Sequence, residues 1–197
     1  MFRTASLSTK LIRIGASLLV VALASISLTL WVTWQLEGGA AAVNEAGRMR
    51  MQTWRLASAV QTSLSPASLG SLVSQFDDSL KLLRTGDPSR PLFVPWDDDV
   101  DVKFAEVDRI WAQRRGHWLA AAPMSATESV MAAEEFVTAI DALVLSIEQQ
   151  LSRLTAILNL FQFVMMALAI IGAVVMLFTG YMYVINPLAH LRQGLKQ

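Results

Sequence analysis

The sequence has 197 residues, of which 54% are hydrophobic, and its formal net charge is zero. This length allows one small domain in addition to membrane segments, and the hydrophobic fraction is high for a water-soluble protein. The absence of cysteine excludes disulfides, thiol nucleophiles and cysteine-ligated metals. All 16 acidic residues lie between Glu37 and Glu148, so both ends of the chain carry only basic charges.

The first long apolar stretch runs from Ile14 to Trp34 without a charged residue. As a helix it is about 31 Å long, which matches a hydrocarbon core of roughly 30 Å. Trp31 and Trp34 lie at its end, where amphipathic rings favour the membrane interface. We expect a transmembrane helix over residues 14–36. A cleaved signal peptide is the alternative, although its apolar region is shorter, about 7–15 residues.

A second uncharged stretch predicts a second transmembrane helix over residues 154–185. Basic residues lie in the N-terminal segment 1–13 and again after the second span. The positive-inside rule therefore places both termini in the cytoplasm and residues 37–153 on the opposite side of the membrane. This is the arrangement of a multi-pass protein of the bacterial inner membrane with a periplasmic domain, and the lipid bilayer is one expected partner.

Helix start and stop signals divide the periplasmic segment into four expected helices. The first is expected over residues 40–64. Ser65 fits the N-cap of the second helix and Pro66 its first position. Gly86 fits the end of this second helix.

The aspartates at positions 97–99 fit the start of the third helix, because acidic side chains complement the helix dipole there. Ser125 and Glu128 form a capping-box pattern at the start of the fourth helix. Short links favour antiparallel neighbours. The expected fold class is therefore all-α: an antiparallel four-helix bundle, continuous with the two transmembrane helices.

Two of these helices carry apolar stripes at 3–4 spacing. In the fourth helix the stripe runs from Val130 to Leu168 without a helix-breaking residue. Any buried helix shows such a stripe, but its continuation into the second span predicts one stiff helix between domain and membrane. In the first helix, Arg50 stands among small and apolar residues of a similar stripe.

A guanidinium in this position needs a partner, because a buried unpaired charge is costly. Three interpretations are open. Arg50 pairs with a carboxylate of its own bundle, such as Glu45 or Asp141; it reaches solvent through its long side chain; or it holds an external anion.

The stretch from Asn44 to Leu56, NEAGRMRMQTWRL, resembles the P-box of NarX/NarQ-type nitrate/nitrite sensor histidine kinases. That box reads approximately N-x-A-G-x-x-R-M-Q-[ST]-[YW]-R-L. A second stretch, residues 136–144, is similar to the second conserved box of the family. Related sensor domains occur in type IV pilus methyl-accepting transducers, so the domain alone does not name the output.

The resemblance implies a homodimer in which Arg50 of each subunit binds one shared nitrate or nitrite. A guanidinium suits this ligand because its paired donors match a planar oxyanion. Gly47 matches the small residue that lets the anion approach the helix. Ala46 and Met51 are further candidate contacts. Arg55 also matches the box and is expected to be a structural or ion-pairing residue, or a weaker ligand contact.

Two residues depart from the family pattern. Glu45 stands where one branch of the family has lysine, and Arg48 stands where other members have a small residue. These residues are expected to place a negative and an additional positive charge near the site. The preference between nitrate and nitrite therefore stays open.

Two further positions are expected to act in signalling. Asp141 lies in the second box, and Pro187 follows the second span. Leucines at 3–4 spacing after Pro187 resemble the opening of a HAMP relay helix, over residues 186–197.

The resulting expectation is the input module of a two-component nitrate/nitrite sensor histidine kinase. It would signal through its second span to a response regulator, by way of a kinase region that these residues do not include. One alternative is the sensor portion of a methyl-accepting chemotaxis or type IV pilus transducer. Another is a structural membrane protein without a ligand.

No catalytic residue, cofactor or metal site is expected. The aspartates near position 97 lack the spacing of a calcium loop, and His117 and His190 are isolated in the sequence. Nucleic acid is not an expected partner, because the segment outside the membrane is net acidic.

Overall fold

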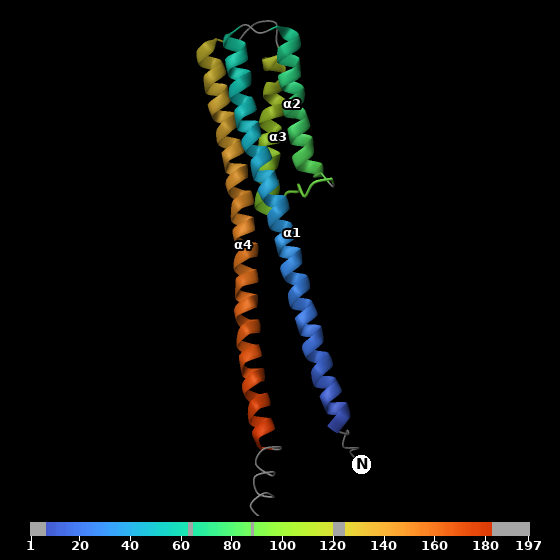
Figure 1. The fold of residues 1–197 in the computed structure, drawn as a ribbon. Helices are drawn as coiled ribbons and strands as arrows, with labels where there is room; N and C mark the ends of the chain where they lie inside the picture. The colour runs from blue at the N-terminus through green and yellow to red at the C-terminus, as the bar shows by residue number, and fades with distance from the viewer. Residues whose placement is uncertain (1–6, 63–64, 88, 120–124, 183–197) are drawn as a thin grey trace, which may run out of the picture. The chain divides into compact units, whose positions relative to one another are not determined.

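The computed structural model consists of four successive α-helices (Figure 1). Their bounds are Leu7–Gln61 for α1, Pro66–Thr85 for α2, Asp98–Trp118 for α3 and Ala126–Gly180 for α4. The structure describes residues 7–62, 65–87, 89–119 and 125–182. Within these ranges there is no strand, only an isolated bridge between Asp87 and Leu92. The all-α class is confirmed, while Pro187 and the expected HAMP segment lie outside the described residues.

The chain divides into two compact units. The bundle unit is Leu30–Thr155. The other unit contains α1 up to Thr29 and α4 from Ala156 onward. Both helices contain segments long and apolar enough to cross a membrane. Large apolar side chains are exposed along these segments, including Leu18 at 61% and Leu177 at 75%. Because so much exposed apolar surface is unfavourable in water, the chain is a membrane protein with two candidate membrane-spanning helices.

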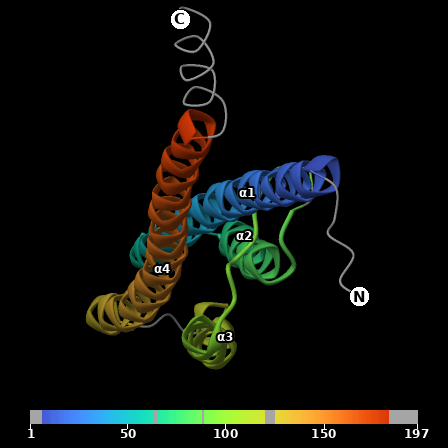
Figure 2. The same cartoon turned by 90° about the horizontal axis from the view of Figure 1, so that it is seen from below.

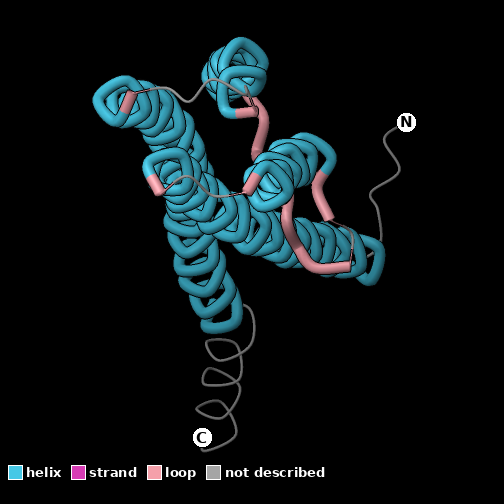
Figure 3. Tube along the Cα trace, turned by 90° about the horizontal axis from the view of Figure 1, so that it is seen from above, coloured by secondary structure: helices cyan, strands magenta, loops and turns pink. Residues whose placement is uncertain are grey.

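Within the bundle unit, the four helices form a closed ring of neighbours, visible from above in Figure 3. Side-chain contacts join α1 to α2, α2 to α3, α3 to α4, and α4 back to α1. The core between them contains three packed rings, Phe76 of α2, Trp111 of α3 and Phe136 of α4, with centroid distances of 4.1 and 5.2 Å from Phe76. α1 adds Met49 and Leu56, which are fully buried. The expected antiparallel four-helix bundle is therefore confirmed.

The expected helix caps are also present. Ser65 accepts a hydrogen bond from the Ser68 backbone N–H at 3.3 Å, and Asp97 accepts one from the Val100 N–H at 2.8 Å. At the start of α4, the Ser125 N–H donates to Glu128 and the Glu128 N–H donates back to the Ser125 hydroxyl. These contacts satisfy N–H groups that have no partner within the helix.

The connection between α2 and α3, residues 86–97, lies at the end of the bundle where α1 enters and α4 leaves (Figure 2). Here the Phe93 N–H donates to the Gly38 carbonyl at 3.4 Å. A Cβ atom at Gly38 would lie 2.2 Å from the Phe93 ring, and one at Gly39 would lie 2.4 Å from Leu151 of α4. The glycine pair therefore lets the connection and α4 approach the α1 backbone from two sides.

We predict that Gly39→Ala destabilises the bundle by about 1–3 kcal/mol, because the added methyl overpacks the contact with Leu151. The measurement is the unfolding midpoint of the purified chain in detergent, followed by circular dichroism. Gly70→Ala is the matched control, since nothing lies within 4 Å of its Cβ position. This control should gain up to about 1 kcal/mol, because alanine is the better helix former. Equal unfolding midpoints for the two variants would contradict the close approach of Leu151 to the α1 backbone at Gly39.

Candidate functional site

Arg50 lies at the edge of α1 that borders α4. Its Nη1 donates to Asp141 Oδ1 at 2.9 Å, and the two side chains are 44% and 50% exposed. The stripe residues on either side, Ala46 and Thr53, are fully buried. Its long side chain carries the guanidinium out of the stripe to the surface, as one of the three interpretations had it. Pairing with Asp141, one of the three interpretations, is what the single chain shows.

The exposed face of α1 gathers several residues of the P-box-like stretch. Gly47, Arg50, Met51 and Trp54 follow the i, i+3, i+4, i+7 spacing that places side chains on one helix face. A Cβ atom at Gly47 would lie 3.5 Å from Arg50 Nη2, so this glycine borders the guanidinium. Met51 and Trp54 are 52% and 42% exposed. The guanidinium is thus flanked by an open backbone position and by unpartnered apolar surface.

Two of the expected contacts lie elsewhere. Ala46 is fully buried in the bundle core. Arg55 lines a groove of about 430 Å³ between α1 and α2, together with hydroxyl side chains such as Ser58 and Ser71. The structure therefore groups Gly47, Arg50 and Met51, and separates Ala46 and Arg55 from them.

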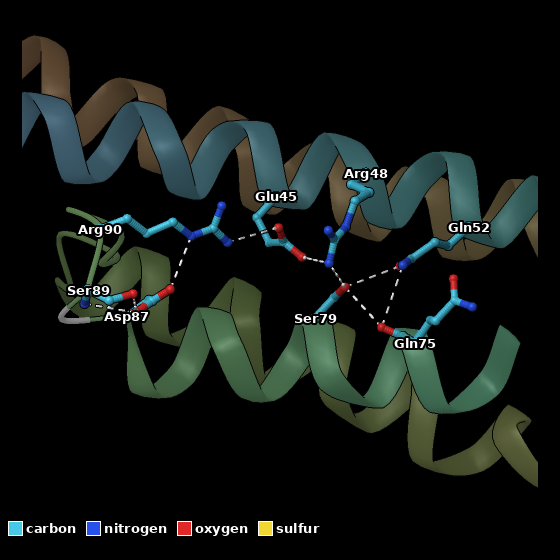
Figure 4. Close-up of polar contacts among 8 residues, drawn as sticks. All are labelled: Glu45, Arg48, Gln52, Gln75, Ser79, Asp87, Ser89 and Arg90. Atoms are coloured by element: carbon cyan, nitrogen blue, oxygen red, sulfur yellow. Dashed lines mark hydrogen bonds and ion pairs between the residues drawn. The ribbon is translucent and has the colours of Figure 1, made fainter. Parts of the chain in front are cut away.

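A second polar cluster lies on the side of α1 that faces α2 (Figure 4). Glu45 is only 4% exposed, and its Oε1 lies 2.7 Å from Arg48 Nη2. Arg90, from the α2–α3 connection, approaches Glu45 Oε2 at 3.9 Å. Among the described residues Oε1 accepts no hydrogen bond, so the two cations stabilise the buried carboxylate mainly by charge.

The cluster continues onto α2. Arg48 donates to the Ser79 hydroxyl at 3.2 Å, and this hydroxyl lies 3.0 Å from the Gln75 carbonyl, its nearer acceptor, and 3.4 Å from Gln52 Oε1. Gln52 and Ser79 are 3% and 0% exposed. We call this cluster the polar clasp, with members Glu45, Arg48, Gln52, Ser79 and Arg90. Because buried polar groups are costly without their partners, the clasp fixes the position of α1 along α2.

The clasp overturns one expectation from the sequence. Glu45 and Arg48 were expected to add charges beside the anion site. Instead they neutralise each other against α2, whereas Arg50 points to α4. The reason is the helical angle of about 100° per residue, which turns neighbouring positions to different faces.

The groove between α2 and α3 is a further concave site, with a volume of about 420 Å³. Four charged groups at this groove are already paired, Arg84 with Asp101 at 2.8 Å and Asp77 with Arg115 at 2.7 Å, whereas Lys81 and Asp108 also line it. Burial opposes ionisation of Asp77, but hydrogen bonds from Arg115 and Trp111 outweigh it and lower the pKa of this carboxyl. These pairs explain four of the charges structurally, so the groove is a weaker candidate than the Arg50 face.

Comparison with known families decides the class of the domain. The family described as the type IV pili methyl-accepting chemotaxis transducer N-terminal region, PilJ, matches residues 31–136, which is more than half of the chain. The chain belongs to the PilJ family. It is therefore a sensor module of a signal-transducing membrane protein. The match includes Arg50 and every member of the polar clasp.

The PilJ match supports the transducer alternative better than the nitrate sensor kinase that the P-box-like stretch suggested. No curated protein matches the sequence significantly. The family assignment therefore gives the kind of module but not its ligand, which depends on the side chains of the site.

We predict that Glu45→Gln lowers the free energy of unfolding by about 1–3 kcal/mol, because it leaves Arg48 and Arg90 without their shared buried carboxylate. The measurement is the chemical unfolding midpoint in detergent. Glu106→Gln is the control, since it removes an exposed ion pair with Arg109 and should leave the midpoint unchanged. If both variants have the same unfolding midpoint as the unchanged chain, the clasp does not stabilise α1.

Proposed function

We propose that this chain is the sensory input module of a transmembrane methyl-accepting transducer that detects nitrate or nitrite through Arg50. The supporting observation is the guanidinium itself. It is held by one surface carboxylate, bordered by Gly47, and open to solvent on the exposed face of α1. Its planar fork of N–H donors can meet two oxygens of a planar oxyanion at once.

Exposed apolar side chains on α1 and on the neighbouring helix α4 support a homodimer. Met51, Trp54 and Leu145 expose 52%, 42% and 54% of their surface within the bundle unit. A second copy packed on this face would bury these apolar groups and bring two Arg50 side chains together. Two cations about 6 Å apart repel by roughly 3 kcal/mol at an effective dielectric constant of about 20. A shared anion replaces this repulsion with two attractions and favours one packing of the dimer.

In the single chain, Asp141 occupies the position that an anion would need. The ligand must therefore displace this carboxylate or share the guanidinium with it. Surface ion pairs of this kind contribute only about 0–1 kcal/mol, so the competition is weak and the pair can open. Asp141 thereby acquires the signalling role that we propose for it, because its release frees the α1–α4 boundary.

The contacts of α4 support this helix as the element that moves. Among the described residues, three ion pairs near the surface join it to the rest of the bundle: Arg50–Asp141, Arg114–Glu135 and Arg153–Asp97. Its buried hydroxyls, Ser129 and Ser146, donate within α4 itself. In the described part of the bundle, the other contacts of α4 with its neighbours are apolar and non-directional, whereas the polar clasp holds α1 on α2. A ligand that prefers one arrangement by about 1–3 kcal/mol would shift α4 and its transmembrane segment.

The proposed topology follows the charge pattern. Both termini lie in the cytoplasm, residues 37–153 form the periplasmic domain, and residues 14–36 and 154–185 cross the bacterial inner membrane. The PilJ assignment favours a methyl-accepting output, while the P-box-like stretch supports a histidine kinase acting on a response regulator as the second candidate. Long glutamate- and glutamine-rich heptads following the module would favour the first output, and a histidine-containing dimerisation helix the second.

We predict that the chain in lipid nanodiscs binds nitrate or nitrite, measured by isothermal titration calorimetry with chloride as the reference anion. Arg50→Ala should abolish the heat, and Arg50→Lys should weaken it, because a lysine lacks the planar fork. Arg109→Ala is the control, since this exposed arginine pairs with Glu106 on α3. Binding that persists in Arg50→Ala, or no difference between the oxyanions and chloride, would refute the proposed site.

Asp141→Asn gives a second, opposite prediction. Removing the competing carboxylate should tighten anion binding by up to about fivefold, the equivalent of about 1 kcal/mol. A structural role for the pair alone predicts weaker binding or none. The sign of the change in Kd, measured by the same titration, separates the two roles.

A further inference from the structure

The end of the bundle unit where α1 enters contains a cleft of about 510 Å³. Trp34 and Glu37 of α1 form one wall. The opposite wall comes from the α2–α3 connection and includes Asp87, Arg90 and Phe93. The Trp34 and Phe93 rings pack with centroids 4.1 Å apart. The cleft therefore combines aromatic surface with one cation and two carboxylates.

The position of this cleft along α1 corresponds to the headgroup layer of a bilayer. The first polar residue after the apolar stretch of α1 follows Trp34, and Glu37 lies about 4.5 Å beyond Trp34 along the helix axis. A bilayer is about 40–45 Å thick with headgroups and roughly 30 Å without them, which leaves about 5–7.5 Å on each side. Trp31 and Trp34 are 48% and 52% exposed, as expected for rings at this depth.

The charged groups of the cleft are not fully used by the protein. Arg90 is 52% exposed, with its Nε 3.2 Å from Asp87 Oδ2, and its contact with Glu45 is 3.9 Å long. A guanidinium has five N–H donors, so donors stay open to the cleft. Glu37 is exposed and has no ion-pair partner among the described residues. The open N–H donors of Arg90 and the unpaired carboxylate of Glu37 thus line the same cleft.

We propose that this cleft binds the headgroup of a zwitterionic aminophospholipid from the leaflet on the bundle side. The lipid phosphate accepts hydrogen bonds from Arg90. The primary ammonium donates to Glu37 and lies against the ring of Trp34, where a cation is attracted to the aromatic face. A trimethylated choline headgroup has no N–H to donate to Glu37, so the cleft selects the primary amine.

The bound lipid would also act on the polar clasp. Arg90 belongs to both the cleft and the clasp, because the same guanidinium approaches Glu45 from the connection (Figure 4). A phosphate on Arg90 holds the connection against α1 at the membrane surface. Lipid binding and the position of α1 are thereby linked through one side chain.

The test uses the full chain, extracted in detergent with equal amounts of three phospholipids of identical acyl chains and analysed by native mass spectrometry. The headgroups are ethanolamine, choline and glycerol. The unchanged chain should retain the ethanolamine lipid at least about fivefold more than the choline lipid, the equivalent of one additional charged hydrogen bond. Equal retention of the three lipids, or preference for the anionic glycerol lipid, would overturn the proposal.

Two variants separate the roles of the charged groups. Arg90→Gln should reduce retention of the ethanolamine and choline lipids alike, because both carry the phosphate. Glu37→Gln should remove only the preference for ethanolamine over choline, and it leaves the clasp intact because Glu37 is not a member. Arg109→Gln, on the exposed face of α3, should retain lipid as the unchanged chain does. If Glu37→Gln keeps the full preference, the amine is not recognised by this cleft and the proposal fails.

Discussion

The structure depends on one buried carboxylate. Glu45 is almost completely enclosed, yet its charge is met by Arg48 from its own helix and by Arg90 from the α2–α3 connection. Separating a buried charge from its partners is far more costly than sliding apolar surfaces. This interaction therefore fixes both the rotation and the register of α1. With Glu45 held against α2, Arg50 lies on the side of α1 that borders α4.

The bundle is consequently asymmetric in how its helices are held. α1, α2 and the connection share buried directional contacts, while α4 packs through apolar side chains and ion pairs near the surface. Directional bonds specify one arrangement, whereas apolar packing tolerates several of similar free energy. A sensor needs both properties, a stable frame and one element with more than one resting position. The helix that continues into the second transmembrane segment is the less constrained one.

The sequence predicted most of the architecture because helix boundaries are local. The caps at Ser65, Asp97 and Ser125 involve residues only three positions apart, and all three are present. The polar clasp was not predicted, since Glu45 meets Arg90 only after α2 and the connection have folded back. The exposure of Arg50 was one of three interpretations that the sequence left open. A 3–4 stripe marks a face of a helix but not its edges, and a long side chain at an edge can leave the core.

The paired glycines Gly38 and Gly39 have a mechanical consequence. They lie within the 55-residue helix α1, where each glycine costs up to about 1 kcal/mol of helix stability relative to alanine. The side chains of Phe93 and Leu151 fill the space beside the two glycines and support this part of the helix from outside. Without these two contacts, nothing beside the helix would offset the cost of the glycines at this point. The glycine pair therefore makes the order of this part of α1 depend on the connection and on α4.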